Sequence, residues 1–148
     1  MDRKPVVQKL VRGPDAYYTV NWSRLAKGSK YDIVKSVPSE AGIFELYYMD
    51  FQKKLCLFHV GKSWYGGLRN EIRERTDAEL ERDPARKKIL DRYECWYRWS
   101  LISSSDDMAD LLFFFAQTYR PGQADIHGSG RYERIFVNEV DADKIVTI

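Results

Sequence analysis

Two runs of β-forming residues around a short polar gap constrain the fold of this chain more than any other sequence feature. The first run, residues 42–49, reads Gly-Ile-Phe-Glu-Leu-Tyr-Tyr-Met, and the second, residues 55–60, reads Leu-Cys-Leu-Phe-His-Val. Aromatic and aliphatic residues of this kind favour strands. Because only the short, mostly polar segment 50–54 separates the two runs, the pattern predicts a β-hairpin.

The residues after the hairpin predict helices and a third strand. Leu68 and Ile72 follow a glycine-rich loop at helical spacing, and residues 84–92 open with a proline that suits the first turn of a second helix. Residues 95–102 are expected to form a third strand, and a longer helix with one apolar stripe should end at Pro121. These elements predict an α/β fold, with a small sheet built on the hairpin and the third strand and flanked by helices.

The two ends of the chain are expected to add to this core. Residues 16–20 have strand character, residues 22–25 are predicted to form a helical turn, and residues 135–140 look like a peripheral strand. Residues 1–36 hold eight Lys/Arg and three Asp/Glu. We therefore predict a basic N-terminal extension packed on a domain of residues 37–148, as one compact unit; the extension is either a phosphate-facing arm or a solubilising segment.

Composition excludes several classes of protein. A chain of 148 residues that is 44% hydrophobic fits one compact domain rather than a disordered tail. The longest apolar run, residues 111–116, is far shorter than the roughly 20 residues needed to cross a bilayer, so no membrane span is expected. The first residues lack the apolar stretch of a secretory signal, and the two cysteines provide neither a disulfide framework nor zinc spacing, so we expect a cytoplasmic location.

The predicted order strand, strand, helix, helix, strand, helix is similar to that of the GIY-YIG nuclease superfamily. Gly42-Ile43-Phe44 resembles the first signature of that family, His59-Val60-Gly61 resembles the second, and Lys62-Ser63 continues it. The resemblance covers about residues 40–121. It implies a small mixed sheet flanked by helices, a nucleic-acid partner, and attack of water on a phosphodiester assisted by Mg²⁺ or Mn²⁺.

The chemistry that the resemblance implies falls on a few residues of this chain. In that family a signature tyrosine helps to activate water; Phe44 replaces one such tyrosine and cannot transfer a proton, whereas His59 replaces the other and can act as a base. A helix arginine that stabilises phosphate charge corresponds to Arg69 in one alignment. In the other alignment Glu71 takes that place, and Arg69 or Arg73 must reach the phosphate.

The implied metal ligand is a glutamate on the last helix, where this chain has Leu112. The nearest acid is Asp110, which lies off the apolar stripe and either faces a cleft as a tentative ligand of Mg²⁺ or Mn²⁺ or is a solvated helix residue. Two hypotheses follow. One is a metal-dependent phosphodiesterase with His59 as base; the other is a catalytically inactive binding module for nucleic acid or protein.

Aromatic and basic side chains near the second signature and on the second helix are candidate nucleic-acid contacts. The rings of Trp64 and Tyr65 either stack on exposed bases or pack in the core. The basic residues of the second helix either contact phosphates or form a solvated helix face. The residues assigned to this role are Lys62, Ser63, Trp64, Tyr65, Arg86 and Lys88.

Overall fold

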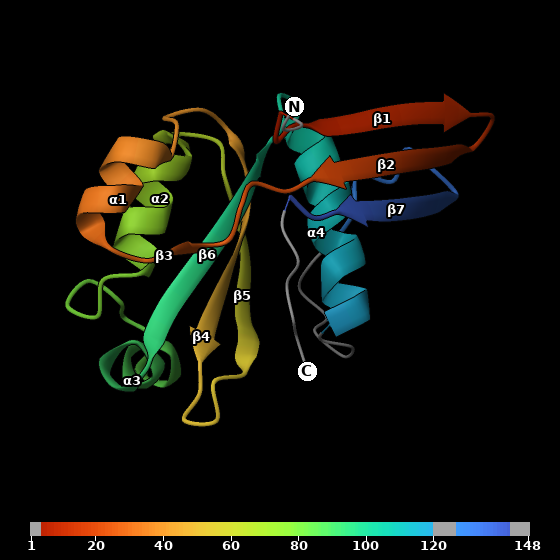
Figure 1. The fold of residues 1–148 in the computed structure, drawn as a ribbon. Helices are drawn as coiled ribbons and strands as arrows, with labels where there is room; N and C mark the ends of the chain where they lie inside the picture. Colours follow the sequence, from red (N-terminus) through yellow and green to blue (C-terminus); the bar gives the residue numbers. More distant parts are fainter. Residues whose placement is uncertain (1–3, 120–126, 143–148) are drawn as a thin grey trace.

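A computed structural model describes residues 4–119 and 127–142 of the chain, which form an α/β fold, as the sequence predicts (Figure 1). In chain order the elements are β1 (Val7–Arg12), β2 (Asp15–Asn21), β3 (Ala26–Lys27), α1 (Lys30–Ser36), β4 (Gly42–Met49), β5 (Leu55–Ser63), α2 (Gly67–Arg75), α3 (Pro84–Arg92), β6 (Glu94–Leu101), α4 (Ser105–Tyr119) and β7 (Arg134–Val140). None of the helices among these residues is long and apolar enough to cross a membrane.

The predicted hairpin is the centre of a four-stranded sheet. The strand order is β3-β6-β4-β5, and each neighbouring pair is antiparallel. The hairpin β4–β5 is confirmed, and so is the third strand, β6, which pairs with the other side of β4. Strand β5 continues past its glycine, because Gly61 and Lys62 still pair with Phe44 and Ile43 of β4.

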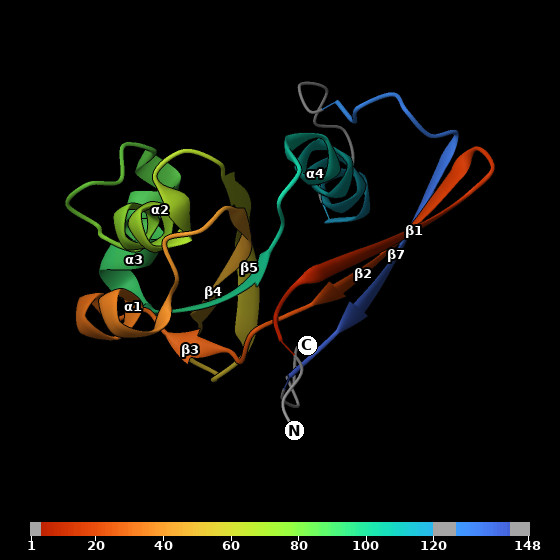
Figure 2. The ribbon, with the colours of Figure 1, turned by 90° about the horizontal axis from the view of Figure 1, so that it is seen from above.

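Helices cover this sheet on both sides. Figure 2 shows α1, α2 and α3 on one side and α4 on the other. Successive residues of a strand point to opposite faces, and β4 supplies a core residue to each layer. Phe44 packs with Leu68 of α2, whereas Ile43 packs with Leu111 of α4. Neighbouring residues of β4 are therefore separated by the sheet, whereas a bulge opposite Leu46 and Tyr47 places both Phe58 and His59 of β5 on the α2 side.

A second sheet joins segments from distant parts of the chain. Its order is β1-β2-β7; β1 and β2 are antiparallel, and β2 and β7 are parallel. Tyr18 and Val20 of β2 pack on the face of α4 that carries Met108 and Leu111, so α4 lies between the two sheets. The predicted strands near residues 16–20 and 135–140 are confirmed, and they form one ladder across the predicted boundary at residue 36.

Residues 22–25 are not helical, which corrects the predicted helical turn. Their backbone instead connects the two sheets, because the Trp22 amide donates to the Val140 carbonyl and the Ser23 amide donates to the Trp99 carbonyl. Helix α1 is absent from the sequence prediction. It buries only Ile33 among its seven residues, so it carries no apolar period that could reveal it.

Candidate functional site

His59 lies on the side of the four-stranded sheet that faces α1, α2 and α3. It pairs with Leu46 of β4, which belongs to the core on that side. The imidazole is half-buried, its ring centroid is 5.6 Å from that of Phe44, and its Nδ1 is 2.9 Å from the Arg86 guanidinium of α3. An arginine can only donate, so Nδ1 accepts and the neutral ring carries its proton on Nε2. The lone pair of Nδ1 is therefore used within the protein.

Gly61 makes room for the two rings that stand at the signature positions. A Cβ added to Gly61 would lie 2.6 Å from the Phe44 ring and 2.8 Å from His59 Nε2. Gly42 is equally confined, since a Cβ there would lie 2.4 Å from the Ser100 carbonyl oxygen and 2.6 Å from the Leu68 side chain. Both signature glycines are thus explained by close packing of strand, helix and ring.

A chain of charged groups runs from the His59 ring towards α2. Arg86 Nε lies 3.7 Å from Glu81, a buried carboxylate that is also 3.6 Å from Arg75. Arg75 in turn donates to Glu71 at 3.1 Å. Arg86 was predicted to contact phosphate. In the structure its guanidinium lies between His59 and the buried acid Glu81 and links them.

The arginines of α2 have separate roles. Leu68 and Ile72 are fully buried on α2, which confirms the helix predicted from their spacing. Arg69 Nε donates to the Val37 carbonyl at 2.7 Å and so holds α2 against the end of α1, while Arg73 is exposed. The guanidinium 2.9 Å from His59 Nδ1 is that of Arg86 on α3.

Asp110 of α4 is buried on the side of that helix that meets β2 of the second sheet. It is 1% exposed, which corrects the solvated alternative. Its carboxylate accepts hydrogen bonds from Tyr18 at 3.0 Å, from the Ser129 amide and hydroxyl at 2.7 and 3.0 Å, and from Arg131 at 2.9 Å. All of these donors come from β2 or from residues 127–132, which the helix pattern of α4 could not reveal.

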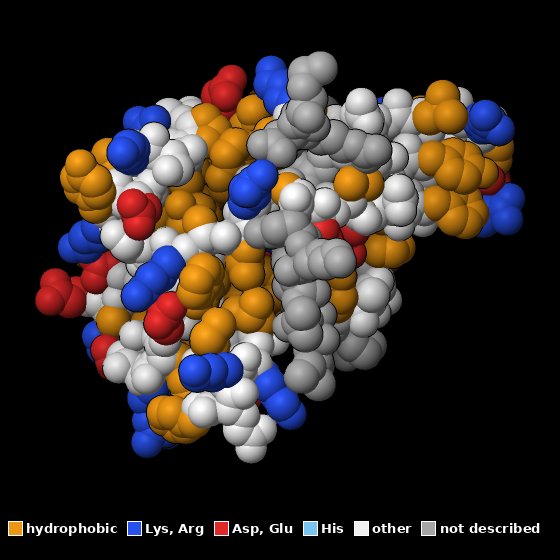
Figure 3. All heavy atoms as spheres, in the orientation of Figure 1, with side chains coloured by type: hydrophobic (Ala, Val, Ile, Leu, Met, Phe, Trp, Pro, Cys, Tyr) orange, Lys and Arg blue, Asp and Glu red, His pale blue; other side chains and the backbone are white. Residues whose placement is uncertain are grey.

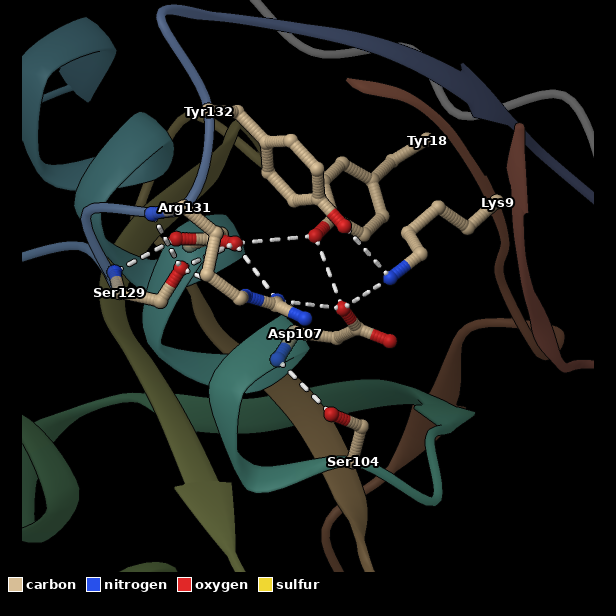
Figure 4. Close-up of polar contacts among 8 residues, drawn as sticks. Lys9, Tyr18, Ser104, Asp107, Ser129, Arg131 and Tyr132 are labelled. Atoms are coloured by element: carbon tan, nitrogen blue, oxygen red, sulfur yellow. Dashed lines mark hydrogen bonds and ion pairs between the residues drawn. The ribbon is translucent and has the colours of Figure 1, made fainter. Parts of the chain in front are cut away.

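Asp107, one turn before Asp110, completes this cluster. Its carboxylate accepts from Lys9 and Tyr18, both at 2.9 Å, and from Arg131 at 2.8 Å (Figure 4). Burial would raise the pKa of Asp107, but hydrogen bonds from Arg131, Lys9 and Tyr18 outweigh it and hold that pKa below its usual range. Burial and the two carboxylates raise the pKa of Tyr18, so its hydroxyl remains a donor.

This cluster does not fit a divalent cation. The two carboxylates are matched by the cations of Lys9 and Arg131, and the Tyr18 hydroxyl, with its one proton, lies within hydrogen-bond distance of both. A hard metal ion requires oxygen atoms that are open to accept it. Over residues 4–119 and 127–142 no group of three or more His, Cys, Asp or Glu side chains is placed to hold a metal.

The predicted catalytic residues are not brought together. His59 faces the α1–α3 layer, and Asp110 lies on α4, on the other side of the four-stranded sheet (Figure 2). Phe44 is fully buried in the core beneath α2. Hydrolysis of a phosphodiester needs base, cation and metal within reach of one phosphate, and these positions do not provide that geometry.

A buried ion pair on the α4 side of the sheet was not predicted. Glu45 of β4 pairs in register with Arg98 of β6, and Arg98 Nε donates to Glu45 at 2.6 Å. Tyr47 also donates to Glu45, at 2.7 Å. Burial raises the pKa of Glu45, and Arg98 opposes this shift. The signal in the sequence is one acid in the first strand run and one base in the third, each alone among β-forming residues.

The loop after β5 carries the most exposed of the predicted nucleic-acid contacts. Tyr65 is 91% exposed and Trp64 is 42% exposed, so neither ring belongs to the core. Lys62, just before them, is exposed, but Ser63 is buried and its hydroxyl is 3.4 Å from the Tyr65 carbonyl oxygen. Lys88 of α3 is exposed. A hollow of about 530 Å³, lined in part by Lys4, adjoins Trp64.

Comparison with known proteins gives a family match alone. The model of a protein family described as "Uncharacterised protein" matches residues 6–148. The chain belongs to this family. The match includes β1, β2 and β7 as well as the four-stranded sheet, so the second sheet lies within the family's extent. No curated protein and no solved structure matches the chain.

Proposed function

We propose that this chain is a nucleic-acid-binding module on a GIY-YIG-like scaffold, without the hydrolytic activity of that superfamily. The observation that carries the proposal is the exposure of Trp64 and Tyr65 directly after the second signature, beside the exposed Lys62. Aromatic rings that protrude next to a cation suit unpaired bases on a phosphate backbone. We call residues 62–65 the aromatic loop.

The scaffold part of the proposal is supported by topology and by the signature glycines. Strands β4, β5 and β6 and helices α2, α3 and α4 follow the element order of the resemblance, with β4 between its two partners. Gly42 and Gly61 stand where a larger residue would collide with α2 or with the two signature rings. The resemblance to the superfamily rests on these same two glycines.

We propose that hydrolysis is absent because of the side chains that occupy the signature and metal-ligand positions and the contacts they make. Phe44 has no exchangeable proton, the Nδ1 atom of His59 accepts from Arg86, and the Asp110 carboxylate is bound by a guanidinium. His59 Nδ1 and the Asp110 carboxylate therefore already have hydrogen-bond partners within the protein. The alternative is that a metal-dependent phosphodiesterase assembles around His59 with Mg²⁺ or Mn²⁺ and uses other ligands.

Binding and cutting are tested together with labelled single-stranded, duplex and branched DNA, with and without Mg²⁺ or Mn²⁺. We expect binding that weakens as salt rises and no cleavage. The variant Trp64→Ala/Tyr65→Ala should bind at least about 5-fold more weakly, since base stacking on an aromatic ring contributes about 1–3 kcal/mol per base. Tyr31→Ala is the matched control, because Tyr31 is an exposed ring on α1.

Each outcome decides one part of the proposal. Metal-dependent cleavage that is lost in His59→Ala would refute the inactive module and support the phosphodiesterase. No binding to any of the DNA forms, or binding that ignores salt, would refute the nucleic-acid partner. Unchanged affinity in the Trp64→Ala/Tyr65→Ala variant, with binding otherwise intact, would remove the aromatic loop from the binding site.

A further inference from the structure

The three-stranded sheet has one face with no helix against it among the described residues. Tyr18 and Val20 of β2 point to α4, so Tyr17 and Thr19, which alternate with them, point the other way. Leu10, Tyr17 and Phe136 are paired in register across β1, β2 and β7, which places them in one row on the opposite side. We call this side the outer face; Figure 3 shows hydrophobic side chains gathered over this end of the molecule.

Two aromatic rings stand together at the centre of the outer face. Tyr17 and Phe136 are 39% and 43% exposed, and their rings stack with centroids 4.9 Å apart and planes 12° apart. The Arg134 guanidinium lies 5.9 Å from the centre of the Phe136 ring. Because the two rings cover one face of each other, the other face of the Phe136 ring, beside the Arg134 cation, is where a flat, electron-rich group can continue the stack.

The charge of the outer face is positive. The row next to the rings consists of Arg12, Asp15 and Arg134, which are paired across the three strands. Asp15 is buried and is held by Arg134 at 3.0 Å, whereas the side chains of Arg12 and Arg134 are exposed. The two guanidinium groups and the one buried carboxylate sum to a net positive charge, which the outer face presents to a partner. The row on the other side of the rings is uncharged, with Gln8 and Asn138 at its ends.

We propose that the outer face binds single-stranded nucleic acid. Unpaired bases would stack on the Tyr17–Phe136 pair, phosphates would lie against the arginine row, and the amides of Gln8 and Asn138 would reach base edges. Stacking requires bases that are not paired in a duplex. The inference rests on the proposed nucleic-acid-binding function and adds to it a second surface, on the other sheet from the aromatic loop, and a single-stranded ligand.

A second copy of this chain fits the outer face less well. The exposed apolar side chains in its central row are Leu10, Tyr17 and Phe136. An interface of standard size buries about 800 Å² on each partner, which needs a larger apolar centre than this row supplies. The arginine row instead complements an anionic partner. Self-association is therefore a competing outcome that the experiment must detect.

The test uses the full chain and a fluorescently labelled 20-nucleotide poly-dT or poly-U strand, with a duplex of equal length for comparison. The variant Tyr17→Leu/Phe136→Leu keeps the apolar contacts of the sheet but removes both rings. We expect it to bind the single strands about 5- to 100-fold more weakly than the unchanged protein. Arg12→Gln should reduce the slope of log affinity against log salt by about 0.7. Phe51→Leu, at an exposed ring in the β4–β5 turn, is the control.

The variants of the two surfaces separate the two proposals. If Tyr17→Leu/Phe136→Leu binds like the unchanged protein while Trp64→Ala/Tyr65→Ala binds weakly, the outer-face proposal fails and the aromatic loop stands. If the unchanged protein binds no strand, both fail. Equal affinity for duplex and single strands would refute the single-stranded ligand. If the Tyr17→Leu/Phe136→Leu variant has a lower mass in sedimentation than the unchanged protein but the same affinity for the strands, the outer face is a self-association surface and the proposal fails. Circular dichroism and thermal melting show that each variant is folded.

Discussion

The ion pair between Arg98 and Glu45 makes stability depend on pH in a way that one substitution can expose. The Glu45 carboxylate is 1% exposed, and the Arg98 side chain is nearly as buried. Arg98→Met keeps the length of the side chain but removes its charge. Without the cation the pKa of Glu45 in the folded state rises further above that of the unfolded chain. The variant therefore keeps its stability at low pH and loses it as the pH rises through that folded-state pKa.

The size of the effect follows from the cost of neutralising Glu45. Removing one partner of a buried ion pair costs about 3–5 kcal/mol. Protonation limits this cost, because neutralising a carboxyl of ordinary pKa 4.5 takes about 3.4 kcal/mol at pH 7 and about 0.7 kcal/mol at pH 5, at 1.36 kcal/mol per pH unit. We expect Arg98→Met to lower the free energy of unfolding by about 3 kcal/mol at pH 7 and about 1 kcal/mol at pH 5.

Urea denaturation of the unchanged protein and the variant, followed by circular dichroism at both pH values, measures this difference. The double variant Arg98→Met/Glu45→Gln should recover much of the stability at pH 7 and lose most of the pH dependence, since the Glu45 charge is gone and Glu139, which lies 3.6 Å from Arg98, still accepts from Trp22 and Tyr119. Lys27→Met removes an exposed cation that is 3.7 Å from Glu94, so it should change stability by less than about 0.5 kcal/mol. Equal losses at the two pH values, or no recovery in the double variant, would refute the reasoning.

Further predictions concern tight packing, the buried acid of α4 and the cysteines. Gly61→Ala should lower stability by about 1–3 kcal/mol, because its Cβ would lie 2.6 Å from the Phe44 ring; an unchanged melting temperature contradicts this close contact. Asp110→Asn should cost about 1.5–3 kcal/mol in urea denaturation and leave DNA affinity unchanged, since its partners are internal; reduced affinity at unchanged stability argues against that role. At pH 8 a thiol reagent should modify Cys56 before Cys95, because burial raises the pKa of Cys95 to about 12; equal rates in the two single Cys→Ser variants would be inconsistent with this order.

The elements predicted from the sequence are those whose signals are local. The hairpin β4–β5 is encoded in two strand runs around a polar turn, and α3 begins at Pro84, with Asp83 as an N-cap whose side chain accepts from the Arg86 amide. An apolar stripe and acids in the first turn indicate helix α4. In each case the information lies within one turn or one strand of the element concerned.

The features that escaped prediction depend on partners far away in the chain. Asp110 meets Ser129 and Arg131, which lie about twenty residues further along the chain and beyond the end of α4. The register that sets Glu45 opposite Arg98 is a property of the assembled sheet. A motif comparison places Asp110 near an implied metal ligand but carries no information about the cations that surround it. Candidate residues could therefore be named one by one from the sequence, whereas their assembly into a site could not be predicted.

The parallel pairing of β2 with β7 also determines the order in which this protein can fold. Asp15 pairs with Arg134, so the ladder closes a loop of more than a hundred residues. Every strand of the four-stranded sheet precedes β7, and that sheet can assemble while β7 is still being synthesised. Until β7 arrives, β1 and β2 form a two-stranded ribbon with an open edge. A chain that terminates before Arg134 would keep that edge exposed and would tend to aggregate.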